Sequence, residues 1–280
     1  MEESPLREAG VGLPPVTAPL ALLTIAGRHR FVLSNLVRRE VRGRYRNAAL
    51  GYGWTVLEPA LLAVVYWFLF TMISGNTDPL YAVWVLIGVI VWSCFGKTLQ
   101  ATVTSLTRNR ALIHLIDLPR PIHPVSSMLS NIVLSLMASL VVFPLLLVFG
   151  VQLNWTIVLI PLAIILAAFQ ALGLGLMLAP FNCVQQDVDH LVRFIVRAGF
   201  FVSPVMWTWE MAVERGGAYI DLIMLNPMVF PITLARRGFE GAALDMPSQA
   251  IVFSIAWGVL TYVVGSMVFC AKERKAVKHL

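Results

Sequence analysis

The chain has 280 residues, of which 58% are hydrophobic and 13% charged, and its formal net charge is +6. This composition excludes an ordinary soluble domain, in which about 25% of residues are charged, and indicates an all-α integral membrane protein. The positive charge gathers beside the apolar segments, which favours contact with anionic lipid and argues against nucleic-acid binding. The three cysteines form no CxxC pair, which argues against a metal or disulfide scaffold.

Residues 1–29 are predicted to be a flexible tail. Their opening stretch is acidic and Pro-rich, and it lacks the basic region and cleavage site of a signal peptide. Residues 30–50 are predicted to form an amphipathic helix at the membrane interface, with arginines on one face and apolar side chains on the other. The apolar positions are Phe31, Leu33, Leu36, Val37 and Val41. Attraction of its arginines to lipid headgroups is one explanation for the charge of this helix.

A helix that crosses a bilayer needs about 20 mostly apolar residues, and six segments approach that length. They are 54–74, 80–104, 123–149, 155–180, 190–209 and 249–270. Residues 51–272 are therefore predicted to form a domain of six transmembrane helices, followed by a basic cytoplasmic tail at 273–280. Lys and Arg concentrate before the first span, between the second and third, and after the sixth, so both termini are expected in the cytoplasm.

Two segments between the spans are predicted to be structured. Residues 105–122 are short and basic, and they end at two prolines, after which the next helix must restart. Residues 210–248 are apolar in part, but Pro227 and Pro231 interrupt them. A stretch of this length with internal breaks is typical of a re-entrant segment, so we expect a helical hairpin that dips from the outer face between the fifth and sixth spans.

Four ionisable residues lie inside the predicted spans, where charges are costly and usually face a cavity or a partner. Glu58 belongs to the first span, Lys97 to the second, and Arg193 and Arg197 to the fifth. Alternating span directions place all four in the cytoplasmic third of the membrane. Such a layer suits a phosphate-bearing substrate, or its members pair with one another. Snorkelling to the headgroups is an alternative for Lys97 and Arg193.

Two motifs imitate catalytic sites. The Gly-Lys-Thr tripeptide at 96–98 resembles the end of a phosphate-binding loop, but that loop needs a glycine where this chain has Val91. The chain is therefore not expected to hydrolyse ATP by itself. Asp187 and Asp189 imitate the metal-binding motif of sugar-nucleotide transferases, which leaves a membrane glycosyltransferase as an alternative. Without a soluble catalytic domain, complementing the helix dipole is the favoured role of the two acids.

Small and aromatic residues mark two further helix faces. A stripe with four-residue spacing predicts close helix packing, either within the chain or at a dimer seam, and consists of Ala167, Ala171, Gly175 and Ala179. In the fifth span, Phe194 and Phe201 share a face with Arg197, which suits an aromatic path for sugars. Trp207 lies where an outer aromatic belt is expected, and Pro204 is expected to kink the span.

In their order along the chain, these features resemble the membrane subunit of ABC-2 type polysaccharide exporters, the family that exports O-antigen, teichoic acid, capsule or cell-wall galactan. The resemblance covers about residues 30–272. It rests on LVRREVRGRYRNAALGYGWTVLEPALLAVVYWFLF, NRALIHLIDLPRPIHPVSSMLSNIV, QQDVDHLVRFIVRAGFFVSPVMW and LNPMVFPI. Permeases of ABC-2 drug or lipid exporters are the nearest alternative, although they usually lack the arginine-rich run into Gly-Tyr-x-Trp.

The resemblance implies a homodimer in the bacterial inner membrane, with two separate ATPase subunits docked on its cytoplasmic side. ATP and Mg would bind the ATPase, and this chain would hold no cofactor or metal. The substrate would be a polyprenyl-diphosphate-linked polysaccharide, with a galactan favoured slightly by the excess of Arg over Lys.

The resemblance also implies three groups of site residues. The substrate entrance would comprise Arg42, Arg44, Tyr52, Trp54 and Glu58. The channel would be lined by Phe194, Arg197, Phe201 and Trp207. The ATPase would dock on a coupling helix from Arg108 to Leu118, at Arg108, Arg110, Leu112, His114 and Asp117.

Overall fold

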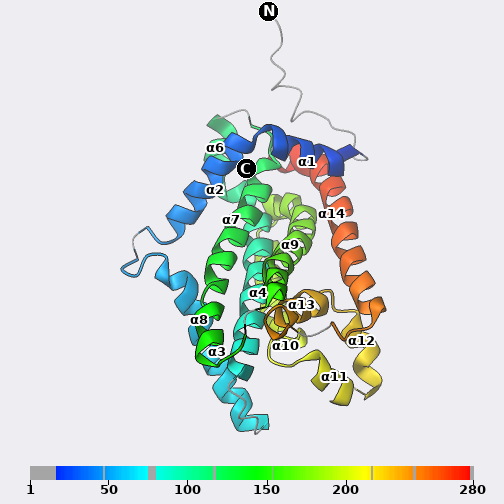
Figure 1. Ribbon diagram of the computed structural model, residues 1–280. Helices are drawn as coiled ribbons and strands as arrows, with labels where there is room; N and C mark the ends of the chain where they lie inside the picture. Colours follow the sequence, from blue (N-terminus) through cyan, green and yellow to red (C-terminus); the bar gives the residue numbers. More distant parts are fainter. Residues whose placement is uncertain are drawn as a thin grey trace, which may run out of the picture.

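The computed structural model describes residues 17–46, 48–74, 80–115, 118–152, 154–215, 217–241 and 244–277. These residues form a helical bundle, as the composition predicts (Figure 1). In chain order the elements are α1 (Ala18–Arg28), α2 (Arg30–Arg44), α3 (Gly53–Ser74), α4 (Leu80–Val103), α5 (Ser105–Arg108), α6 (Arg110–Leu115), α7 (Ile122–Ser139), α8 (Val142–Val148), the short 3-10 helix η2 (Trp155–Val158), α9 (Leu159–Val184), α10 (Asp187–Val202), α11 (Trp209–Arg215), η3 (Gly217–Tyr219), α12 (Ile220–Met224), α13 (Val229–Glu240) and α14 (Ser248–Val277).

Helix α4 forms the centre of the bundle. It is apolar around most of its circumference and buried along most of its length, because α3, α7, α9, α10 and α13 all pack against it. A helix that is hydrophobic all round is typical of such a central position. On the far side of α9, α14 completes the bundle.

The small-residue stripe of α9 packs within the chain. Ala167, Ala171 and Ala179 are fully buried, and a Cβ atom added to Gly175 would lie 2.5 Å from the Thr102 side chain of α4. Of the two roles left open by the sequence, contact between α4 and α9 is therefore the one that the structure supports. Small side chains let the two backbones approach closely.

Among the described residues, four helical segments are long and apolar enough to cross a membrane. They are Leu80–Val103, Ile122–Val148, Trp155–Val184 and Ser248–Glu273. The predicted first span is represented by a shorter apolar helix, Gly53–Leu69. Helix α10 has only 16 residues and carries two acids in its first turn, so it does not meet the same criterion. The chain is a multi-pass membrane protein, and the count of six spans stays a prediction.

The prediction for the end of the fifth span was wrong. A kinked helix was expected over 190–209, but α10 begins at Asp187 and ends at Val202. Ser203 has an extended backbone (φ −87°, ψ 154°), as is favoured for a residue before proline. Pro204 thus ends the helix instead of bending it, and Trp207 lies in the connection to α11.

The segment 210–248 is built of short helices, as expected, but its second half is more deeply buried than an outer hairpin suggests. Nearly every residue of α13 is buried, because this helix packs against α4, α9 and α14. Gly241 ends α13 in the left-handed conformation, with φ 67°, a common helix C-cap. Whether the segment re-enters a membrane stays a prediction.

The N-terminal prediction also needs correction. Residues 18–28, assigned to a flexible tail, form α1, while residues 1–16 lie outside the described part. Ala18, Leu22 and Ile25 are buried, and the Tyr262 hydroxyl of α14 donates to the Pro19 carbonyl at 3.0 Å. At the other end, α14 continues to Val277, into the segment predicted as a tail.

Helix α2 lies within the predicted 30–50 segment, although it ends at Arg44 and not near residue 50, and its place at a membrane interface stays a prediction. Leu33 and Leu36 are buried, mainly against α7. Phe31 was placed on the same apolar face, but its side chain is exposed. The interface helix thus turns a narrower apolar face toward the bundle than its sequence suggests.

Two leucines of α1 give a matched test of this packing. Leu22 is 2% exposed and Leu20 is 72% exposed. Leu22→Ala is expected to destabilise the protein by about 2–5 kcal/mol, because it leaves a cavity between α1 and α14. Leu20→Ala should change stability little. Thermal unfolding of both variants in detergent checks this, and equal midpoints would contradict the role of α1 as part of the bundle.

Candidate functional site

The chain turns sharply between α2 and α3. The amide of Gly51 donates to the carbonyl of Ala48 at 2.9 Å, and the amide of Gly53 donates to the carbonyl of Leu50 at 2.8 Å. Gly51 has φ 49°, a left-handed conformation that glycine adopts readily. The Gly-Tyr-Gly triplet thus forms the turn, which brings the Tyr45 and Tyr52 rings into an edge-on contact with centroids 6.2 Å apart.

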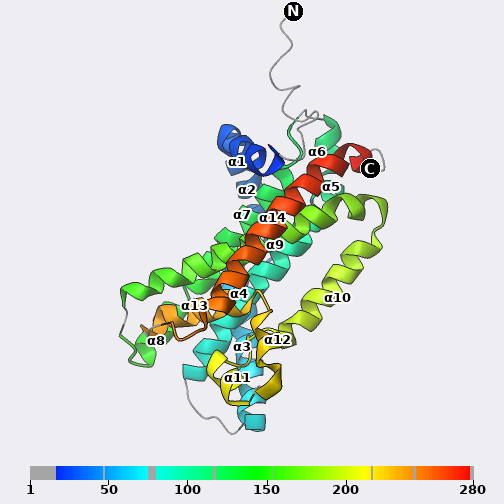
Figure 2. The same ribbon diagram turned by 90° about the vertical axis from the view of Figure 1, so that its right-hand side faces the viewer.

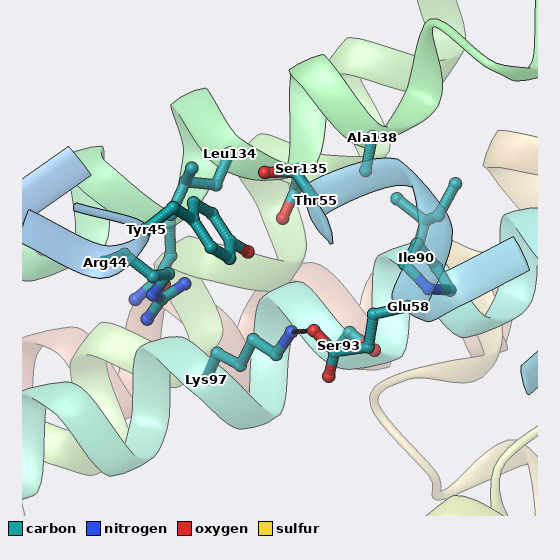
Figure 3. A pocket seen from close by; sticks show the side chains of 12 residues that line it. Arg44, Tyr45, Thr55, Glu58, Ile90, Ser93, Lys97, Leu134, Ser135 and Ala138 are labelled. Carbon is teal, nitrogen blue, oxygen red and sulfur yellow. Dashed lines mark hydrogen bonds and ion pairs between the residues drawn. The ribbon is translucent and has the colours of Figure 1, made fainter. Parts of the chain in front are cut away.

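Behind α2 lies a recessed cleft formed by three adjoining hollows that share Arg44. Their volumes are about 30, 230 and 280 Å³. Helices α3, α4, α5, α7 and α10 supply the remaining walls. The cations that line this recessed cleft are Arg44, Lys97, Arg108 and Arg193. Figure 3 shows Arg44 and Tyr45 at one end of the smallest hollow and Glu58 with Lys97 on its α3 and α4 walls.

Three of these cations are paired with carboxylates. Lys97 Nζ lies 2.9 Å from Glu58 Oε2 (Figure 3), and Arg193 Nη2 lies 3.0 Å from Asp189 Oδ2. Two of the ionisable span residues therefore pair with each other, which was one of the predicted possibilities. Asp189 serves as a partner for Arg193 one helical turn away.

The third pair joins α2 to the segment predicted to dock an ATPase. Arg108 Nη2 donates to Glu40 Oε1 at 2.9 Å and to Ser127 Oγ at 3.0 Å. Next to it, Arg39 Nη2 donates to Asn109 Oδ1 at 2.9 Å. These contacts connect α2 with α5 and α7, so the coupling segment and the interface helix are held together by polar side chains.

The predicted coupling helix from Arg108 to Leu118 is interrupted at Asn109, and its described helical part after that residue is α6, Arg110–Leu115. Asn109 separates α5 from α6, and its side-chain amide donates to the Ser105 carbonyl. Arg108 faces the cleft, whereas Arg110 is exposed and Leu112 is partly buried. The side chain of His114 and the whole of Asp117 lie outside the described residues.

The five predicted entrance residues do not form one site. Arg44 and Glu58 line the recessed cleft, while Arg42 and Tyr52 line a separate apolar hollow of about 530 Å³ between α2 and α7. Trp54 lines neither hollow and is exposed near the start of α3. The prediction thus joined residues from two faces of α2, and their role at a substrate entrance stays a prediction.

The predicted channel residues of α10 do share a face. Phe194, Arg197 and Phe201 are all exposed, on a helix that lies along one side of the bundle (Figure 2). Arg197 makes no hydrogen bond or ion pair with the described residues. Trp207 stands apart from this face, because it lies beyond the end of α10 and donates from Nε1 to the Phe201 carbonyl at 3.5 Å.

Sequence reasoning missed Glu40 and Asn131. Glu40 is an acid within a run of arginines, and Asn131 is a polar residue within an apolar span. Both line the cleft. The rule that polar residues inside membrane helices mark functional sites was enough to single out Asn131, whereas the pairing of Glu40 with Arg108 spans 68 positions.

Comparison with known proteins places the chain among transporters. It is 27% identical over 256 residues to the O-antigen export system permease protein RfbA of Myxococcus xanthus, covering 89% of this chain and 95% of that protein. It is 25% identical to RfbA of Klebsiella pneumoniae, with coverages of 84% and 89%. The polysialic acid transport protein KpsM of Escherichia coli is 22% identical, with coverages of 81% and 90%.

A sequence model of the ABC-2 type transporter family matches residues 32–239. The match runs from α2 through α13 and so includes the recessed cleft, the coupling segment and the central helix α4. The chain belongs to the ABC-2 type transporter family.

Proposed function

We propose that this chain is the membrane subunit of an ATP-driven exporter that moves a polyprenyl-diphosphate-linked polysaccharide out of the bacterial cytoplasm. The observation that carries the proposal is similarity over 81–89% of the chain to permeases whose names specify O-antigen export or polysialic acid transport. The cation-lined cleft behind α2 supports it, because a lipid diphosphate is an anion that arginine and lysine bind well.

In the proposed assembly, two copies of the chain enclose the path and two ATPase subunits bind on the cytoplasmic side of the inner membrane. The exposed apolar side chains of α10 offer a surface for the second copy, with Arg197 among them. The cations around α2, α5 and α6 favour a cytoplasmic location for this end of the bundle, and both termini are then cytoplasmic. ATP hydrolysis belongs to the partner.

Docking of the ATPase on α6 gives a direct test of this assignment. Arg110→Asp combined with Leu112→Asp is expected to lower polysaccharide export at least about tenfold, the loss in affinity caused by about 1.4 kcal/mol of interface energy. Export is measured as polysaccharide on the surface of cells that lack their own copy of this chain and contain its cognate ATPase. Arg28→Asp, on the exposed face of α1, is the control and should export normally.

Two outcomes would contradict the proposal at different points. Normal export by the Arg110 and Leu112 variant would refute the docking assignment alone. Failure of the wild-type chain and its ATPase to export any polysaccharide, together with export of a drug or a simple lipid, would refute the proposed substrate.

A further inference from the structure

We propose that Glu40 and Glu58 are displaceable counter-ions that occupy the recessed cleft until a phosphate-bearing group takes their place. The identity of the natural ligand rests on the proposed function, but the exchange itself is a property of this chain. In the structure, these two carboxylates neutralise cations from α5 and α4, at 2.9 Å in both cases. The cleft is thus held in a self-neutralised state.

The charges of the cleft are almost balanced. Lys97, Arg108 and Arg193 each have a carboxylate partner, whereas Arg44 makes no hydrogen bond or ion pair with any described residue. Arg44 is also the one residue shared by all three hollows. An arriving anion therefore meets an unneutralised guanidinium first, with cations on the opposing walls that must exchange their partners.

Each ion pair has at least one side chain that is open to solvent. The side chains of Lys97 and Glu58 are 39% and 47% exposed, and those of Arg108 and Glu40 are 47% and 16% exposed. Ion pairs open to solvent contribute little stability because water screens them. A phosphate group offers several oxygens in the geometry that guanidinium binds through two hydrogen bonds. Exchange of a carboxylate for such a group is therefore favourable.

Two buried polar atoms in the cleft lack a partner, and one of them, the Thr55 hydroxyl, suits an anionic ligand. Thr55 Oγ1 and Asn131 Oδ1 are buried and have no hydrogen-bond partner among the described residues. Both residues line the hollow that contains Glu58 and Lys97, and both are at least 94% buried, since they are 6% and 3% exposed. Buried polar atoms are usually satisfied. The Thr55 hydroxyl can donate to an anion in this hollow.

Release of Glu40 would also loosen α2. The Glu40–Arg108 pair and the Arg39–Asn109 hydrogen bond are the polar side-chain contacts between α2 and the segment 105–115 within the described residues. A phosphate group that took Arg108 from Glu40 would leave only the second contact. Binding of a ligand in the cleft would thereby weaken the contact of α2 with the segment that we assign to ATPase docking.

The exchange predicts that removing a counter-ion tightens anion binding. Pyrophosphate is titrated calorimetrically into the purified full-length chain in detergent. Glu40→Gln and Glu58→Gln are each expected to bind pyrophosphate about three- to tenfold more tightly than the wild type, because the cation no longer has to leave a partner. Arg44→Gln should weaken binding by a similar factor. Size-exclusion profiles establish that each variant is folded.

Glu214→Gln is the control for net charge. Glu214 is exposed on α11, at the opposite end of the bundle from α2 (Figure 1), so its removal should leave the affinity unchanged. Equal affinity of the wild type, Glu40→Gln and Glu58→Gln for both pyrophosphate and short-chain phosphatidylglycerol, or no binding of either probe, would overturn the proposal. An equal gain in Glu214→Gln would do the same, since it would reduce the effect to overall charge.

A second titration identifies the source of the phosphate. If short-chain phosphatidylglycerol reproduces the pattern and pyrophosphate does not, the cleft accepts an ordinary phospholipid headgroup; the reverse pattern assigns it to a diphosphate. Neither titration requires export or the ATPase. Tighter binding by Glu40→Gln in a chain that exports no polysaccharide would support the exchange and refute the proposed function. Polysaccharide export by a chain in which Glu40→Gln does not tighten binding would support the proposed function and refute the exchange.

Discussion

Replacing Arg236 with methionine is expected to destabilise the protein by about 3 kcal/mol or more. Arg236 is 4% exposed, and it donates to three main-chain carbonyls, those of Trp84 at 3.3 Å, Val205 at 2.8 Å and Trp207 at 2.8 Å. Methionine fills similar space but leaves these carbonyls without a donor, at a cost of about 1–3 kcal/mol for each buried group.

The three carbonyls belong to different parts of the fold. One is in α4 and two are in the turn that follows α10, so Arg236 fixes α13, α4 and that turn together. Burial lowers the pKa of Arg236 to about 10, and the side chain therefore stays protonated at neutral pH. Arg236→Lys should recover only part of the stability, because an ammonium group cannot reach three separated acceptors as a planar guanidinium does.

The neighbouring Arg237 provides the matched control. It contacts the carboxylates of Glu210 and Glu240 and donates no hydrogen bond to a main-chain carbonyl of the turn that follows α10. Burial raises the pKa of Glu240, so this acid takes up a proton more readily once Arg237 is removed. Arg237→Met should therefore cost less than Arg236→Met, because protonation of Glu240 removes the charge that would be left without a partner. Thermal unfolding in detergent checks both variants, and equal losses would contradict a special role for Arg236.

Replacing Gly265 with alanine is expected to disrupt the packing of α14 on α9. A Cβ atom at Gly265 would lie 2.1 Å from the Gly173 carbonyl oxygen, and one at Gly173 would lie 2.5 Å from the Tyr262 amide nitrogen. Main-chain atoms cannot move aside as a flexible side chain can. Each substitution must push the two helices apart, which we expect to cost about 3 kcal/mol or more.

Two other glycines calibrate this effect. A Cβ atom at Gly258 of the same helix would meet the Gln170 side chain at 3.1 Å, and one at Gly27 of α1 would meet nothing within 4 Å. Gly258→Ala should therefore be mildly destabilising, and Gly27→Ala should stabilise α1 by up to about 1 kcal/mol. Unfolding midpoints that failed to follow the order Gly27, Gly258, Gly265 would refute the close approach of α9 and α14.

Much of the region around α2 could be predicted from the sequence, because its signals are local. The alternation of arginines with apolar residues predicts α2, and the Gly-Tyr-Gly triplet predicts the turn before α3. The charges of Glu58 and Lys97 inside apolar segments indicate a partner or a cavity. In the structure these two residues are partners that line a cavity.

Features that depend on contacts between distant segments could not be predicted in the same way. Helix α1 is too short to be recognised as a span from its sequence. Its packing depends on the surface that α14 provides. The separation of Arg42 from Arg44 onto two sides of α2 depends on where α7 lies. The burial of α13 likewise depends on the space left between α4 and α9. A single sequence does not reveal that space.

The contact between α1 and α14 has a consequence for the topology of the chain. The first described helix and the C-terminal end of the last one meet at the same end of the bundle (Figures 1 and 2). A chain that starts and finishes on one side must traverse the molecule an even number of times. If the four segments that satisfy the length criterion all cross and the segment 210–248 does not, α3 and α10 either both cross the membrane or both fail to do so. Under these conditions, whether α3 crosses the membrane determines whether α10 does.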